Sequence, residues 1–255
     1  AVGTLSGARV QQSNLERIGS LSGFSQWLLR PGPWVGGFDL PFGLPRELVL
    51  ALNWPTQWEP CIRHFAAMDR QQIRAIFQAF CDARPVGGKF AHRATDGPAQ
   101  SSPSMKWVNP PVAFMLHAGV VRMLDAGMYF PGLQFAENET HADRVALEAY
   151  PGLLAREVIG NRSYKSDERA RQTPERLIAR KTLIDALEAG LAPLLQGAGL
   201  RLKLSHAQRD DQAADPTGDP TGPSVQVRIG DDAVVASVSL SHRYIPARQL
   251  PDKAV

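Results

Sequence analysis

The stretch Trp34-Val35-Gly36-Gly37-Phe38-Asp39-Leu40-Pro41 predicts a short buried strand that ends at a carboxylate. It is apolar over five residues and is closed by a proline, which is typical of an inner strand of an α/β sheet. A second stretch, Val145-Ala146-Leu147-Glu148-Ala149-Tyr150-Pro151, has the same character. A buried carboxylate is costly unless it is paired, hydrogen-bonded or bound to metal. Asp39 and Glu148 are therefore candidate metal ligands, with a loop cap or an arginine partner as the alternative.

The elements around these two strands predict a mixed α/β domain. Val2 to Leu5 and Val10 to Ile18 have the pattern of a hairpin, and Phe24 to Leu29 that of a short helix. Apolar residues spaced i, i+3, i+4 and i+7 predict an amphipathic helix over 71–82. A further helix is expected over about residues 111–126, and more helices after Pro151, one of them beginning at Thr173-Pro174.

Two regions of the chain lack periodicity. Residues 84–109 predict a long loop, and loops of that length are usually functional or disordered. Residues 208–224 are rich in proline, glycine and aspartate and predict a linker. We therefore expect an α/β domain over 1–207, this linker, and a strand-like tail over 225–255.

Composition narrows the class of protein. With 255 residues the chain is long enough for one large domain or two small ones. No apolar run approaches the roughly 20 residues of a membrane helix, and the start shows no secretory leader, so we expect a cytoplasmic protein without a membrane partner. Cys61 and Cys81 have no metal-ligand spacing and are expected to be buried free thiols. The net charge of +3 permits a polyanionic partner without requiring one.

The segment from Arg84 to Arg93 is a candidate phosphate-binding loop. It places Arg84, Lys89, His92 and Arg93 around the pair Gly87-Gly88. Backbone amides of such a loop bind anions, and arginine and lysine add charge-assisted contacts. A solvated loop with incidental charge is the equal alternative. No Gly-x4-Gly-Lys-Ser/Thr spacing is present, so a P-loop is not indicated.

Two further groups of residues suit a phosphate-bearing partner. Lys106 precedes Trp107, an arrangement that suits base stacking, although Trp107 fits the core better. Tyr164-Lys165-Ser166 lies in the charge-dense segment 156–181, where a solvated helical face is the commoner outcome. No Gly-x-Ser-x-Gly or Gly-x-Gly-x-x-Gly is present, which argues against a serine hydrolase elbow and a dinucleotide fold.

Several of these strings together resemble one family. They are residues 34–45, 83–93, 106–111 (Lys106-Trp107-Val108-Asn109-Pro110-Pro111), 147–151 (Leu147-Glu148-Ala149-Tyr150-Pro151), 164–166 and 204–210. The family is catalogued as domain of unknown function number 429 and is regarded as a group of predicted nucleases of RNase H-like fold. The resemblance covers roughly residues 1 to 219.

This resemblance implies a mixed five-stranded sheet flanked by helices, with Mg²⁺ or Mn²⁺ held by carboxylates at strand ends. Two such ions ~4 Å apart would stabilise the attacking and leaving oxygens of a phosphodiester. Asp39 and Glu148 match two of the expected ligands. We expect Lys165 and His92 to join them in catalysis, and the following residues to contact phosphate: Arg84, Lys89, Arg93 and Lys106.

The sequence departs from the family pattern at both ends. The family's first strand, which carries an acidic residue, has no counterpart here, and Gly218-Asp219 is followed by Pro220 where a helix should begin. A third metal ligand would have to come from Asp219, Asp231 or Asp232. The leading hypothesis is a metal-dependent nuclease or phosphodiesterase, inactive if the ligand set is incomplete. The alternatives are a non-catalytic module that binds nucleic acid or another polyanion, and a phosphohydrolase acting on a small phosphorylated metabolite.

Overall fold

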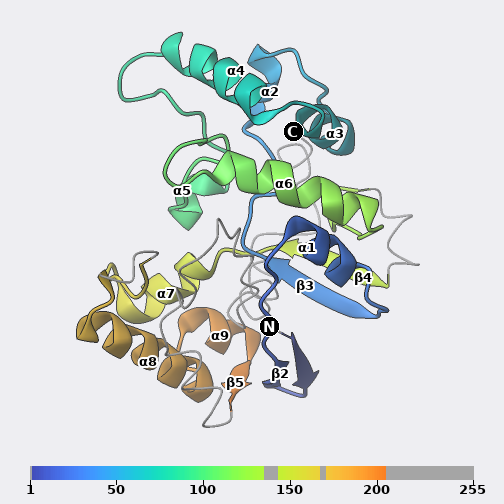
Figure 1. The fold of residues 1–255 in the computed structure, drawn as a ribbon. Coiled ribbons are helices and arrows are strands. Elements are labelled where there is room, and N and C mark those ends of the chain that lie inside the picture. Colours follow the sequence, from blue (N-terminus) through green and yellow to red (C-terminus); the bar gives the residue numbers. More distant parts are fainter. Residues whose placement is uncertain (1, 135–142, 167–170, 205–255) are drawn as a thin grey trace.

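The structure is a computed structural model that describes residues 2–134, 143–166 and 171–204 (Figure 1). Its strands are β1 (Val2–Ser6), β2 (Arg9–Asn14), β3 (Trp34–Phe38), β4 (Arg144–Glu148) and β5 (Arg201–Lys203). Its helices are α1 (Leu21–Leu28), α2 (Arg46–Ala51), α3 (Trp58–Ala66), α4 (Arg70–Asp82), α5 (Asp96–Ala99), α6 (Val112–Asp125), α7 (Pro151–Ile159), α8 (Pro174–Ala189) and α9 (Pro193–Ala198).

The five strands form two small sheets. In the first, β1 pairs antiparallel with β2, which pairs parallel with β5. In the second, β3 and β4 are parallel, with Phe38 opposite Glu148. The mixed α/β class is thus confirmed. The expected five-stranded RNase H-like sheet is not observed in the described part of the chain, because the far edge of β4 meets Tyr129 rather than another strand.

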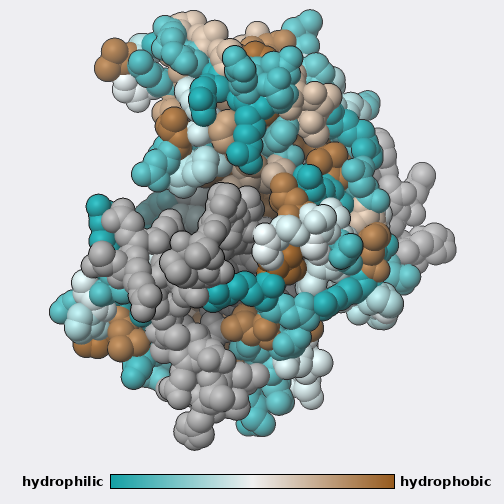
Figure 2. Space-filling view, viewed as in Figure 1, coloured by the Kyte–Doolittle hydropathy of each residue, from teal (hydrophilic) through white to brown (hydrophobic). Residues whose placement is uncertain are grey.

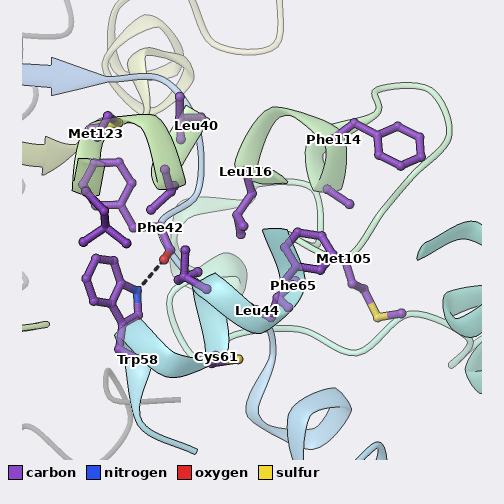
Figure 3. Packing of buried hydrophobic residues seen from close by; sticks show 14 of the residues in the cluster. Leu40, Phe42, Leu44, Trp58, Cys61, Phe65, Met105, Phe114, Leu116 and Met123 are labelled. Carbon is purple, nitrogen blue, oxygen red and sulfur yellow. Dashed lines mark hydrogen bonds between the residues drawn. The ribbon is translucent and has the colours of Figure 1, made fainter. Parts of the chain in front are cut away.

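An aromatic core packs α1, α2, α3, α4 and α6 together with β3. Phe65 of α3 and Phe77 of α4 stack in parallel, with ring centroids 5.8 Å apart. Helix α6 crosses this core and contributes Leu116 among other apolar side chains (Figure 3). Trp58 donates its indole N–H to the Phe42 carbonyl over 2.6 Å, so the polar atom of this buried ring is satisfied. The segment after β3 is thereby fixed against α3.

A second, smaller core holds α7, α8, α9 and β5 together in one lobe (Figure 1). It contains Leu154 of α7, Leu187 of α8, Leu195 of α9 and Leu202 of β5. Because α7 begins directly after β4, the start of this helix lies at the carboxyl end of β4.

Most of the elements expected from the sequence are present. The hairpin, the helices over α1, α4 and α6, and the strands before Asp39 and at Glu148 are confirmed with end shifts of a few residues. Helix α4 starts with a capping box between Asp69 and Gln72. Helix α8 begins after Thr173 as predicted, but the Thr173 side chain makes no cap hydrogen bond. Cys61 and Cys81 are buried free thiols.

The long loop is more structured than predicted, because 84–109 contains the single turn α5. Trp107 packs against the aromatic core, as the core interpretation expected. The predicted linker 208–224 and tail 225–255 lie outside the described residues. Among the described residues no helix has the length and apolar character to cross a membrane. Apolar residues lie in small groups across the described surface in Figure 2.

Candidate functional site

The carboxyl ends of β3 and β4 bring Asp39 and Glu148 to the same edge of their sheet. Glu148 lies opposite Phe38 in the parallel register, and Asp39 follows Phe38 directly. Burial raises the pKa of Asp39; the positive charge of Lys165 opposes this shift, whereas the charge of Glu148 adds to it. The predicted convergence of the two carboxylates is therefore present.

Glu148 is held by an arginine. Arg93 donates Nη1 and Nη2 to its two carboxylate oxygens over 2.8 and 2.7 Å, and the Phe42 amide donates to Oε2 over 2.9 Å. Arg93 also pairs with the fully buried Asp96 over 2.9 Å. Burial by itself would lower the pKa of Arg93. The negative charges of Glu148 and Asp96 have the larger combined effect, so the pKa of Arg93 is raised. The arginine-partner interpretation of Glu148 therefore applies.

The described carboxylates do not fit the predicted two-ion site. Both oxygens of Glu148 already accept hydrogen bonds from Arg93. No group of three or more His, Cys, Asp or Glu side chains that could hold a metal occurs among the residues described. Asp219, Asp231 and Asp232 lie outside those residues. Binding of Mg²⁺ or Mn²⁺ stays a prediction, and no chemical step is derived from it.

Asp39 instead faces a cavity of about 330 Å³ beside α7. One wall is the face of α7 that carries Gly152, Ala155, Arg156 and Ile159. The other is the loop that follows the helix, with Asn161, Arg162, Tyr164 and Lys165. Tyr150 and Gly160 complete the lining. Among the described residues, the lining thus contains three cationic side chains and one carboxylate.

The positions of two of these cations are set by local contacts. Arg156 lies over the Tyr150 ring, 5.4 Å from its centroid, and donates to the Tyr150 hydroxyl and to the Ala99 carbonyl. Arg162 donates Nε to the Ile159 carbonyl over 3.0 Å, at the end of α7 where a cation is favourable. Gly160 ends α7 with a φ of 62°, a value that suits glycine. The chain therefore turns back and places Arg162 at the cavity.

The loop that forms the second wall is attached to α8. Arg180, only 9% exposed, donates Nη1 to the Tyr164 carbonyl over 2.8 Å and to Gln172 over 3.1 Å. The Gln172 amide in turn donates to the Ser166 carbonyl over 2.8 Å. The backbone on both sides of Lys165 is thus anchored to one buried guanidinium.

The other predicted phosphate contacts do not line this cavity. Arg84 pairs with Glu47 and donates to the Gly88 carbonyl over 2.7 Å, and Lys89 lies 4.0 Å from Asp82. His92 is exposed, and Lys106 is half-buried in the loop before α6. Arg93 is committed to Glu148 and Asp96, as described above. Of the predicted site residues, the structure brings Asp39 and Lys165 together at the cavity.

Sequence reasoning missed Arg156, Arg162 and Tyr150 as site residues. A signal was available, because Gly152, Arg156 and Ile159 are spaced by four and three residues and so share a helix face. The spacing could not show that this face turns toward Asp39, since that depends on how α7 leaves β4.

Comparison with known proteins concerns another part of the chain. A family model described as an AAA lid domain matches residues 224–255. The AAA+ ATPase ClpV1 of Pseudomonas aeruginosa is 73% identical over 30 residues, which are 12% of this chain and 3% of that protein. The chaperone protein ClpB of Porphyromonas gingivalis is 67% identical over 30 residues, 12% of this chain and 4% of that protein. No solved structure matches.

These matches correct the family resemblance. The matching family is an AAA lid domain. It is neither domain of unknown function number 429 nor a nuclease family, so the identification as an RNase H-like nuclease is wrong. The functions built on it, from phosphodiester cleavage to polyanion binding and phosphohydrolysis, are overturned by the same finding. The chain spans only 3–4% of the length of these relatives.

Proposed function

We propose that the described part of the chain is a binding module for one small phosphate-bearing ligand, held in the Asp39–Lys165 cavity. The carrying observation is the convergence of Arg156, Arg162 and Lys165 on a cavity of about 330 Å³. Arginine and lysine form the strongest contacts with phosphate oxygens, because both partners are charged. The volume lies at the lower end of the range of small-molecule sites, which suits a metabolite rather than a polymer.

The electrostatics of the cavity favour an anion over a cation. Arg93 already neutralises Glu148, so Asp39 is the carboxylate left facing the cavity. Burial raises the pKa of Asp39, and the positive charge of Lys165 opposes this shift. Arg162 and Lys165 are exposed, so their charges are accessible to a ligand that enters from solvent.

The test is calorimetric titration with propyl phosphate at low salt. We expect binding by the wild-type chain and a loss of affinity of about tenfold or more in Lys165→Ala, because a charge-assisted contact contributes at least about 1.4 kcal/mol. Lys181→Ala is the matched control, since it removes the same charge from an exposed position of α8 outside the cavity. If both variants lost the same affinity for propyl phosphate, the effect would come from net charge alone, and the proposal would be contradicted.

A second function is proposed for residues 224–255, on the strength of the AAA lid match. In this proposal the segment serves as a lid element of an AAA+ ATPase of the ClpV1 or ClpB kind. The printed sequence has no Gly-x4-Gly-Lys-Ser/Thr stretch, so the nucleotide-binding loop of such an ATPase would have to come from elsewhere.

A chimera tests this second function. The 30 matched residues of ClpV1 are replaced by those of this chain, and ATP hydrolysis is measured. At 73% identity most packing positions are unchanged, so hydrolysis is expected to persist at near the ClpV1 rate. A chimera with the same 30 residues in scrambled order is the control. If both chimeras were equally inactive, the segment would not be a functional lid.

A further inference from the structure

The cavity contains one side chain, Asp39, whose presence is not explained by the binding of an anion. Arg162 and Lys165 suit a phosphate, but Asp39 carries the same sign of charge as the phosphate. The lining also includes uncharged side chains, with Ala155 and Ile159 on α7 and the ring of Tyr164 on the loop. The lining therefore combines a cationic part, an apolar part and a hydrogen-bond acceptor.

Asp39 lacks a donor in the described part of the chain. None of those residues donates a hydrogen bond to its carboxylate or pairs with it within ion-pair distance, although Lys165 acts on it electrostatically. An ionised carboxylate can only accept hydrogen bonds, and a partly desolvated one is costly without donors. A ligand that supplies hydroxyl donors at this point would satisfy Asp39.

We propose that the ligand is the phosphate monoester of a sugar or polyol, with its hydroxyls donating to Asp39 and its phosphate bound by Arg162 and Lys165. This inference rests on the proposed function and specifies its ligand class. The carbon skeleton of the ligand would lie along Ala155 and Ile159. Asp39 and the two cations would then contact two different groups of one molecule.

Arg156 supports the same arrangement by shaping the cavity rather than by occupying it. Its guanidinium is held by Tyr150 and Ala99, so the Tyr150 ring is fixed between Arg156 and Gly152. A Cβ at Gly152 would lie 3.0 Å from the Tyr150 ring, which is closer than normal contact. The absence of a side chain at Gly152 thus allows the Tyr150 ring to lie against this turn of α7.

The test compares glycerol 3-phosphate with propyl phosphate, which differ only in two hydroxyls. Calorimetry on the wild-type chain should give a preference for glycerol 3-phosphate of about tenfold or more, the size of a hydrogen bond to a charged acceptor. In Asp39→Asn, which keeps the shape of the side chain, most of that preference should disappear. Propyl phosphate should bind Asp39→Asn at least as tightly as wild type, because a like charge has been removed.

The outcomes separate the two proposals. Equal affinities of the wild-type chain for the two esters would overturn the hydroxyl inference and leave the proposed function standing. A preference that persists unchanged in Asp39→Asn would also overturn it, since another group would then read the hydroxyls. Binding of neither ester would overturn the proposed function, and this inference with it.

Discussion

Replacing Arg93 by alanine is expected to lower the free energy of unfolding by about 3–5 kcal/mol, the usual cost of removing one partner of a buried ion pair. Arg93 is the shared partner of Glu148 and of Asp96, whose side chain is fully buried. Without the guanidinium the buried Asp96 and the half-buried Glu148 would both lose their charged partner. For a domain of this size the loss corresponds to a fall in Tm of roughly 6–20 °C, which calorimetric melting measures.

Arg30→Ala is the matched control for this prediction. Arg30 makes an equally good bidentate pair with Glu16 over 2.8 Å, but its side chain is 48% exposed. Exposed pairs contribute about 1 kcal/mol or less, so this variant should melt within a few degrees of wild type. If Arg93→Ala lost no more stability than Arg30→Ala, the network around Glu148 would be solvated and not a structural centre.

The second large effect is expected for Phe77→Ala. Chemical denaturation should show a free energy of unfolding lower by about 3–5 kcal/mol than that of wild type. Phe77 is fully buried and stacks on Phe65, and its ring also packs in a tilted arrangement with Trp54 and in a T-shaped one with Trp107. Alanine would leave a cavity that these rigid rings cannot fill by small rotations. Because Trp107 belongs to the 84–109 loop, the variant should also loosen the segment that carries Arg93.

Phe80→Ala on the same helix separates burial from helix propensity. Phe80 is half-buried and lies under the Arg84 guanidinium, 5.0 Å from it. Replacing this phenylalanine by alanine removes less buried area, so the free energy of unfolding should fall clearly less than in Phe77→Ala. Equal losses for the two variants would mean that the cost comes from α4 itself and not from the aromatic stack.

The strand ends could be predicted because their signal is local. Asp39 and Glu148 each follow an apolar run closed by a proline, and this pattern requires no knowledge of the rest of the chain. The partner of Glu148 could not be found in the same way. Arg93 lies 55 residues away in a loop without periodicity, and only the tertiary fold brings its guanidinium to the end of β4.

The family resemblance illustrates a different limit. The resemblance rests on strings within residues 1–219, and a match at residues 224–255 overturns the functions that it implies. The valines of that last segment predict strand-like alternation, but such periodicity describes a local conformation and does not identify a family. Thirty residues at 73% identity carry information that no hydrophobic pattern contains.

The anchoring of the 160–166 loop to α8 connects the cavity to a helix that does not line it. Arg180 is not among the lining residues, yet the carbonyl of Tyr164 depends on it. Alanine scanning limited to the lining would therefore leave out a residue that holds one of the two walls in place. Variation in α8 can therefore change which ligands fit while every contact residue stays the same.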